Sequence, residues 1–302
     1  MTSTARPNPK APWQIWRDGA GRLSALRLAA LIFLVLPTAI ALYDFVTVGF
    51  GPRPLNDVIH RTGYWALIFL MVALGISPLG RIARFNRLLD VRRIIGVGAF
   101  AYIAAHLTLY VADQSYNLWK VASEIALRLY LTIGFVALLG LAALAITSTD
   151  GMVRRLGAKR WQRLHQSIYV IGLLGIIHFF QQVKADVWVP TYVAGLFGWL
   201  IGYRLMVRFR YGRSEPPTWA LLALTIAVTV LNFVAEAIGI GLSFNVSPLR
   251  VLEMAFDFDP ASIRPGWAVL ASGLIVVAID VVRARIAARR RSARRVERTI
   301  PA

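Results

Sequence analysis

The sequence contains no cysteine among its 302 residues. This absence excludes disulfide bonds, iron–sulfur clusters on cysteine ligands, thiolate catalysis and covalently attached c-type haem. Charged residues are also scarce, at 16% of the chain, whereas 57% of the residues are hydrophobic and the mean hydropathy is +0.59. Such a composition is typical of a polytopic membrane protein and not of a soluble domain.

Acidic residues are few: 15 Asp and Glu stand against 34 Lys and Arg, which gives a formal net charge of +19. A surplus of this size could suit nucleic acid, but the basic residues fall between the apolar runs and in the tails. In a membrane protein such clusters usually set topology. We therefore predict no nucleic-acid partner, and membrane lipid as the surroundings of the chain.

Long apolar runs dominate what is present. A spanning helix needs about 20 mostly apolar residues, and turn or charge signals such as "GFGPRP" and "RFRYGRSEPP" separate the runs. The sequence predicts an all-α, polytopic helix bundle with eight spans, at about residues 28–48, 63–80, 94–112, 127–147, 166–183, 188–207, 218–242 and 266–282.

Basic residues recur in every second connection and in both tails, whereas the alternate loops are thin or acidic, as in "EMAFDFDPASIR". By the positive-inside rule, both termini are predicted to be cytoplasmic. The N-terminal stretch is too long and too polar for a signal peptide, so the first helix is expected to be uncleaved.

Two of the four histidines are predicted to lie at one depth. His106 lies 12 residues after Ile94, about 18 Å into the membrane, and His178 lies 13 residues after His165, roughly 19–20 Å in. Neutral imidazole is the usual axial ligand of b-type haem. The pair predicts a haem b between the helices at 94–112 and 166–183, although each ring could instead bond a backbone carbonyl.

The other two histidines are less specific. His165 lies at the cytoplasmic edge, where it could bind a second haem or simply lie at the interface beside Trp161. Since 13 residues turn an ideal helix by about 140°, His165 and His178 can share one face only if the helix is irregular. His60 lies too high to bind the haem of His106; a propionate contact, a quinone site and plain exposure remain open.

Several stretches resemble a known family. "DVIHRTGYWALIFLMVALGISPL", "RRIIGVGAFAYIAAHLTLYV" and above all "STDGMVRRLGAKRWQRLH", with a second His downstream, are similar to MsrQ (formerly YedZ). MsrQ proteins are haem-binding membrane subunits of the MsrPQ methionine-sulfoxide reductase system, within the ferric-reductase-like transmembrane superfamily. The resemblance runs from about residue 20 to about 212.

The resemblance implies an electron-transfer subunit of an oxidoreductase complex in the bacterial inner membrane. Electrons would pass from the respiratory quinone pool through haem b (one or two) to MsrP, a periplasmic molybdopterin enzyme that repairs oxidised methionine; FMN has also been attached to the family. His106, His165 and His178 match the family's haem histidines, and His60 matches its helix-two histidine. No catalytic residue is implied in this chain itself.

Two departures qualify the resemblance. Oxidase relatives carry a second histidine on the third helix, but this chain has Arg92 fourteen residues before His106, so an inner haem would have one histidine, an unusual ligand, or be absent. The predicted division is a basic tail at 1–22, a ferric-reductase-like haem b domain at 23–212, and an extension at 213–302. The extension places Asn232 and Glu236 at membrane depth, where the buried carboxylate could relay protons, line a quinone pocket or only bond a neighbouring helix.

The sequence disfavours two other classes of protein. A self-contained NADPH oxidase or ferric reductase needs a cytoplasmic flavin and nicotinamide domain, but only "RFRYGRSEPP" follows the sixth span before more membrane, with no GxGxxG fingerprint. A separate flavin reductase could still supply electrons. A proton-coupled transporter would be expected to show repeated halves, and the sequence shows no such repeat.

Overall fold

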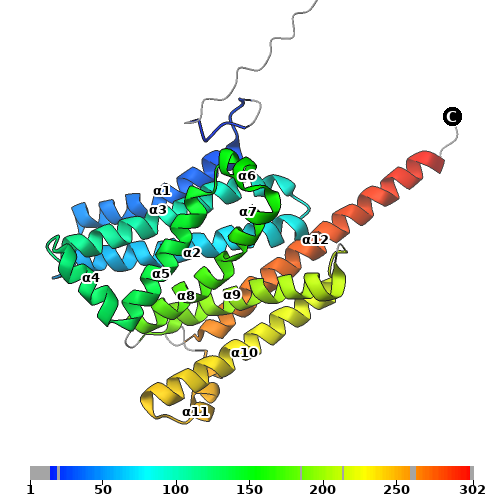
Figure 1. Cartoon of the computed structure of the whole chain (residues 1–302). Helices are drawn as coiled ribbons and strands as arrows, with labels where there is room; N and C mark the ends of the chain where they lie inside the picture. Colours follow the sequence, from blue (N-terminus) through cyan, green and yellow to red (C-terminus); the bar gives the residue numbers. More distant parts are fainter. Residues whose placement is uncertain (1–13, 19–20, 184–185, 213, 259–262, 300–302) are drawn as a thin grey trace, which may run out of the picture. The chain divides into compact units, whose positions relative to one another are not determined.

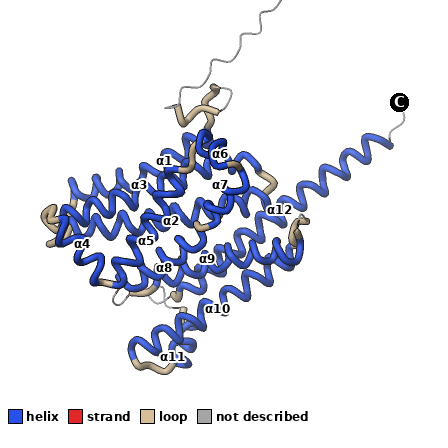
Figure 2. Tube along the Cα trace, in the orientation of Figure 1, coloured by secondary structure: helices blue, strands red, loops and turns tan. Residues whose placement is uncertain are grey.

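The computed structural model describes residues 14–18, 21–183, 186–212, 214–258 and 263–299, with side chains described up to residue 289 and at Ser292. Across these residues the chain is helical with short loops and no strand (Figure 2). Most of the predicted basic tail at 1–22, and the side chains near the C-terminus, lie outside the described residues. The predicted all-α membrane fold is confirmed.

All eight predicted segments form helices, and in the described chain seven helices are long and apolar enough to cross a membrane. The helix over the other predicted span, α9 (Trp188–Met206), is not among the seven. Its Trp, Tyr, Gly and Pro residues and Arg204 make it less apolar than its neighbours.

The chain divides into two compact units. Unit 1 comprises Met1–Ser77 and Asn86–Gln181, and unit 2 comprises Pro78–Phe85 and Gln182–Ala302. In unit 1 (Figure 1) the helices are α1 (Ala25–Thr47), α2 (Pro54–Ile82, whose last turn belongs to unit 2), α3 (Leu89–Asp113), α4 (Leu118–Leu127), α5 (Leu129–Ile146), α6 (Asp150–Leu156), α7 (Ala158–Gln166) and α8 (Ile168–Gln182). In unit 2 they are α9, α10 (Thr218–Phe244), α11 (Pro248–Glu253) and α12 (Pro265–Thr299).

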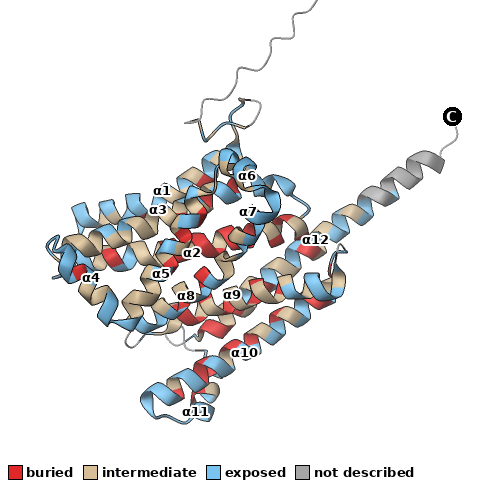
Figure 3. Cartoon of the chain, in the orientation of Figure 1, coloured by how far each residue is buried: buried red, intermediate tan, exposed pale blue. Residues whose placement is uncertain are grey.

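Unit 1 is built around α2. Of its apolar window, 61% is buried, against 11–17% for the windows of α1, α3, α5 and of α7 with α8 (Figure 3). Phe69 on α2 is fully buried, and its ring contacts those of Phe33, Trp65 and Tyr102 at centroid distances of 5.1, 5.6 and 4.9 Å. The outer helices expose many large apolar side chains, as expected for helices that face lipid.

Unit 2 packs α9, α10 and α12 against one another. Among the described residues, it contains all the polar or charged ones that are buried: Thr191, Thr225, Thr229, Asn232, Glu236 and Asp280. Asn232 donates to the Thr191 carbonyl at 2.9 Å, and Glu236 pairs with Arg264 at 3.4 Å. Both predicted membrane-depth polar residues therefore bond other segments of this unit, which is the packing role among the three considered.

A charged cluster, which we call the Glu215 clamp, joins three segments of unit 2. The Glu215 carboxylate accepts two hydrogen bonds from Arg84, after α2, at 2.9 Å each, and one from Arg283 of α12 at 2.8 Å. Arg283 also pairs with Asp280 at 2.7 Å. The bonds from Arg84, and next those from Arg283, hold the pKa of Glu215 at about 2, well below its ordinary 4.5.

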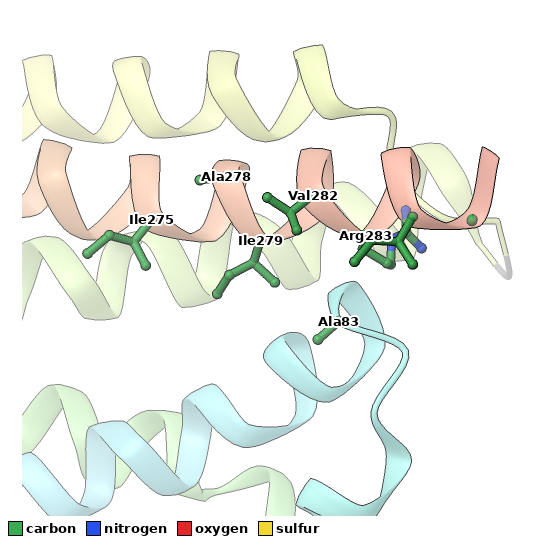
Figure 4. A pocket seen from close by; sticks show the side chains of 8 residues that line it. Ala83, Ile275, Ala278, Ile279, Val282 and Arg283 are labelled. Atoms are coloured by element: carbon green, nitrogen blue, oxygen red, sulfur yellow. The ribbon is translucent and has the colours of Figure 1, made fainter. Parts of the chain in front are cut away.

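An apolar groove of about 610 Å³ lies beside this cluster (Figure 4). Ala83 forms one wall, and Ile275, Ile279 and Val282 of α12 line the other, with Arg283 at one end. These isoleucine and valine side chains are exposed on a candidate membrane span.

Candidate haem site

His106 projects from α3 onto α2. Its Nδ1 lies 2.8 Å from the carbonyl oxygen of Ile59, and the ring is half-buried. Gly63, four residues after Ile59 on α2, lies directly against the ring. A Cβ at this position would stand 3.0 Å from both Cε1 and Nδ1 of the imidazole. The ring therefore reaches the helical carbonyl through the space left by a missing side chain.

His178 repeats this arrangement on a different pair of helices. It projects from α8 onto α5, where its Nδ1 lies 2.8 Å from the carbonyl oxygen of Tyr130. Gly134, four residues after Tyr130, lies against the ring, and a Cβ there would stand 2.8 Å from Cε1 and Nδ1 and 3.1 Å from Cγ. Both imidazoles are therefore held by the same device: a helical carbonyl and a glycine one turn later.

The hydrogen bonds fix which ring nitrogen is available. A carbonyl oxygen can only accept, so Nδ1 of each neutral ring carries the proton and Nε2 keeps its lone pair. Histidines that bind metal almost always donate their other ring N–H to a carbonyl or carboxylate in this way. A hydrogen bond to a backbone carbonyl was the alternative to haem ligation, but this bond occupies only one of the two ring nitrogens. Both residues therefore fit an axial ligand of haem. The His106 ring also lies within electrostatic range of His178 and His60.

His165 has different surroundings. It is half-buried near the end of α7, and its Nε2 lies 3.2 Å from Thr147 Oγ1 after α5. The Thr147 hydroxyl donates to the Ala143 carbonyl at 2.7 Å, so the imidazole is the donor toward it. The ring stacks on Trp161 at 3.9 Å, and the Trp161 indole N–H donates to the Thr147 carbonyl at 2.9 Å. The Nε2 atom of His165 is therefore hydrogen-bonded to Thr147, whereas His106 and His178 make their hydrogen bonds through Nδ1.

The helix that carries His165 and His178 is interrupted, as their spacing requires if they are to share a side. α7 ends at Gln166, and α8 begins at Ile168, with Ser167 between them. The two histidines contact opposite ends of the same helix, α5, through Thr147 and Tyr130. A break at Ser167 therefore accompanies two rings that both face α5.

The other two predicted site residues lie at the edges of unit 1. Arg92 is exposed in the first turn of α3, and its charge acts on the His165 ring together with that of Arg93, which pairs with Asp150 at 2.6 Å. His60 is exposed on α2, next to the residue whose carbonyl holds His106. In the described part of the chain, the side chains of Arg92 and His60 make no hydrogen bond to His106 or His178, and their predicted roles stay predictions. In the described chain, no group of three or more His, Cys, Asp and Glu could hold a metal ion.

Gly63 and Gly134 were not predicted from the sequence. Two glycines near His106 and His178 on the histidines' own helices contact other side chains. Of these, Gly98 lies against Leu34 of α1 and serves helix packing, and Gly175 is in ordinary contact with Leu67. A signal was present, since "IHRTG" and "YLTIG" each place glycine four residues after the accepting carbonyl. It could not be used without knowing which helices meet.

Comparison with known proteins agrees with this fold. Residues 62–176 match the family model described as ferric reductase like transmembrane component, so this part of the chain is similar to ferric-reductase-like membrane proteins. A Rhodospirillum rubrum relative is 39% identical over 199 residues, which are 66% of this chain and 93% of the relative. Relatives from Xanthomonas campestris pv. campestris (42% over 173 residues, 55% of this chain and 79% of the relative) and Xanthomonas oryzae pv. oryzae (36% over 211 residues, 68% and 84%) are also similar.

All three relatives carry the name protein-methionine-sulfoxide reductase heme-binding subunit MsrQ. The chain belongs to the MsrQ family. No solved structure matches it.

Proposed function

We propose that this chain is the haem-binding, electron-transferring membrane subunit of a protein-methionine-sulfoxide reductase, with one haem b held between His106 and His178. The observation that carries the proposal is the pair of Nδ1–carbonyl bonds at 2.8 Å, which leave the Nε2 lone pair of each ring available to iron. The names of the relatives support the same assignment.

The finer electron path is part of the proposal. Respiratory quinol would donate electrons, and a periplasmic MsrP-like molybdopterin reductase would accept them and reduce methionine sulfoxide in proteins. When bound, the haem would supply the one-electron redox chemistry. The chain itself holds the two imidazoles in place on helices that are apolar enough to cross a membrane.

We assign no second haem to this chain. Nε2 of His165, the atom that usually binds haem iron, already donates to Thr147, and the ring is stacked on Trp161. A location in the inner membrane with both termini in the cytoplasm is proposed on the distribution of Lys and Arg between alternate loops.

A spectrum and a reconstitution test the proposal. Full-length protein purified in detergent should show the reduced-minus-oxidised difference spectrum of b-type haem, with one haem per chain by pyridine haemochrome. In liposomes, quinol should reduce this haem, and an MsrP-type enzyme with a methionine-sulfoxide peptide should reoxidise it. Absence of haem refutes the proposal. Reduction by a flavin reductase but not by quinol would replace the donor and support the ferric-reductase alternative.

A further inference from the structure

The two glycines against the imidazoles are unlike the other close-packed glycines of unit 1. At Gly63 and at Gly134, the three nearest heavy atoms that a Cβ would meet are all atoms of the histidine ring. At Gly98 and Gly140 the nearest atoms belong instead to the aliphatic side chains of Leu34 and Ile171. The first two positions therefore make room for a ring and the last two for ordinary helix packing.

The reason for glycine follows from helix geometry. The carbonyl of residue i points along the helix toward residue i+4, so the side chain of residue i+4 stands beside that oxygen. An imidazole from another helix reaches the oxygen at 2.8 Å only when this neighbouring side chain is absent. Ile59 with Gly63, and Tyr130 with Gly134, both satisfy this condition.

We propose that Gly63 and Gly134 are positioning residues that set the reduction potential and the retention of the haem through the Nδ1 hydrogen bonds of His106 and His178. The inference rests on the proposed haem site. A bond from Nδ1–H to a carbonyl fixes the tautomer and raises the basicity of Nε2. A more basic axial ligand stabilises ferric iron, so loss of the bond raises the potential, and hydrogen bonding around the ligands is one of the levers by which proteins tune haem.

The two positions should differ in degree. A Cβ at 134 would meet the ring at 2.8 Å, which real Cβ atoms essentially never do, whereas a Cβ at 63 would meet it at 3.0 Å. Gly134→Ala is therefore expected to displace its histidine more than Gly63→Ala. Replacing such supporting groups typically costs roughly ten- to a hundred-fold in metal affinity, and we expect a loss in this range for Gly134→Ala and a smaller one for Gly63→Ala.

The experiment compares these variants with Gly140→Ala and Gly96→Ala in the purified full-length protein. Gly140 is a matched control, because it lies on the same helix as Gly134 and its Cβ would be 2.8 Å from Ile171 of α8, which also carries His178. Gly96 on α3 has nothing within 4 Å and controls for the substitution itself. The measurements are haem per chain, melting temperature and midpoint potential by redox titration.

Gly134→Ala is expected to raise the midpoint potential and to lose haem. Gly63→Ala is expected to raise the potential and to retain most of its haem. The potentials of Gly140→Ala and Gly96→Ala should be unchanged, even where Gly140→Ala lowers the melting temperature.

Unchanged potential and haem content in both Gly63→Ala and Gly134→Ala would overturn the inference while leaving the proposed function standing. A shift in Gly140→Ala as large as in Gly63→Ala would also overturn it, since packing alone would then account for the effect. If the parent protein contains no haem, the proposed function itself has failed. If Gly134→Ala does not fold, the inference is tested by Gly63→Ala alone: a raised midpoint potential supports it, and an unchanged potential overturns it.

Discussion

The chemistry proposed for this protein depends on two single side chains. His106 and His178 are the histidines whose Nε2 atoms stay available, because their Nδ1 atoms bond carbonyls. His106→Ala or His178→Ala is expected to abolish the haem b spectrum, since either change removes one axial ligand. Pyridine haemochrome on the purified variants measures this. His60→Ala, at an exposed position of α2, is the control and should retain its haem. Full haem content in either ligand variant contradicts the pairing.

His165, in contrast to His106 and His178, is predicted not to be needed for haem binding. Its ring belongs to a cluster with Trp161 and Thr147, and its Nε2 is occupied by the threonine hydroxyl. His165→Ala is therefore expected to keep one haem per chain with an unchanged Soret band, while a donor step that depends on this cluster is slowed. Haem stoichiometry together with the rate of haem reduction by quinol separates the two effects. Loss of every haem signal would place His165 among the ligands of the main site.

At the scale of elements, the sequence predicted more of the framework than of the contacts. Apolar runs of about 20 residues indicate membrane helices whatever surrounds them, so the helices were predictable. The interruption near Ser167 was predictable if His165 and His178 were to face the same side, because 13 residues of ideal helix would turn their rings about 140° apart. The partners of the rings were not, since the contact of His178 with Tyr130 joins residues 48 positions apart.

The partners of the buried polar residues in the extension could not be predicted from the sequence either. Asn232 and Glu236 were recognisable as costly groups at membrane depth, but their partners, Thr191 and Arg264, come from different segments. The pattern of α10 supplies one face for these groups, because residues at spacings of three and four lie on one side of a helix. Which partner each group finds is decided by the packing of α9, α10 and α12.

The Glu215 clamp gives a pH prediction for these elements. The pKa of Glu215 is held at about 2 rather than 4.5, first by its bonds from Arg84. At pH values above 4.5 the carboxylate is ionised in both folded and unfolded chains, and its stabilising contribution is complete. As the pH falls from 4.5 toward 2, the unfolded chain takes up the proton first, so the contribution decreases and is lost near pH 2.

Glu215→Gln should accordingly melt roughly a few degrees lower than the parent at neutral pH. The difference in melting temperature between the two proteins should shrink on acidification below pH 4.5. The effect stays small because the carboxylate side chain is 35% exposed and solvent screens it. Melting curves of both proteins in one detergent, from neutral to acidic pH, provide the measurement. A difference that stays constant down to pH 2, or that grows on acidification, would show that the carboxylate charge is not what stabilises this cluster.

At the scale of the whole molecule, the question is what the third of the chain beyond the family match contributes. The R. rubrum relative is 93% covered by 66% of this chain. The haem-type histidines, their carbonyl partners and the two glycines all lie in unit 1. Within unit 2, α9 depends on the extension: the Trp199 indole N–H donates to Thr225 at 3.0 Å, and Val193 is fully buried.

Deletion of residues 213–302 is therefore expected to leave one haem b per chain and to lower the melting temperature. The haem should remain because no group that holds it is removed, whereas α9 loses its polar and apolar partners. Each lost 1 kcal/mol corresponds to about 2–4 °C at this size, so a decrease of several degrees is expected from hydrogen bonds and packing together. Haemochrome and melting curves of the membrane-extracted truncation, beside the full chain, provide the measurement. A truncated chain that inserts into the membrane but binds no haem would show that the extension supports the haem site, and that the predicted boundary at residue 212 does not separate haem binding from the rest.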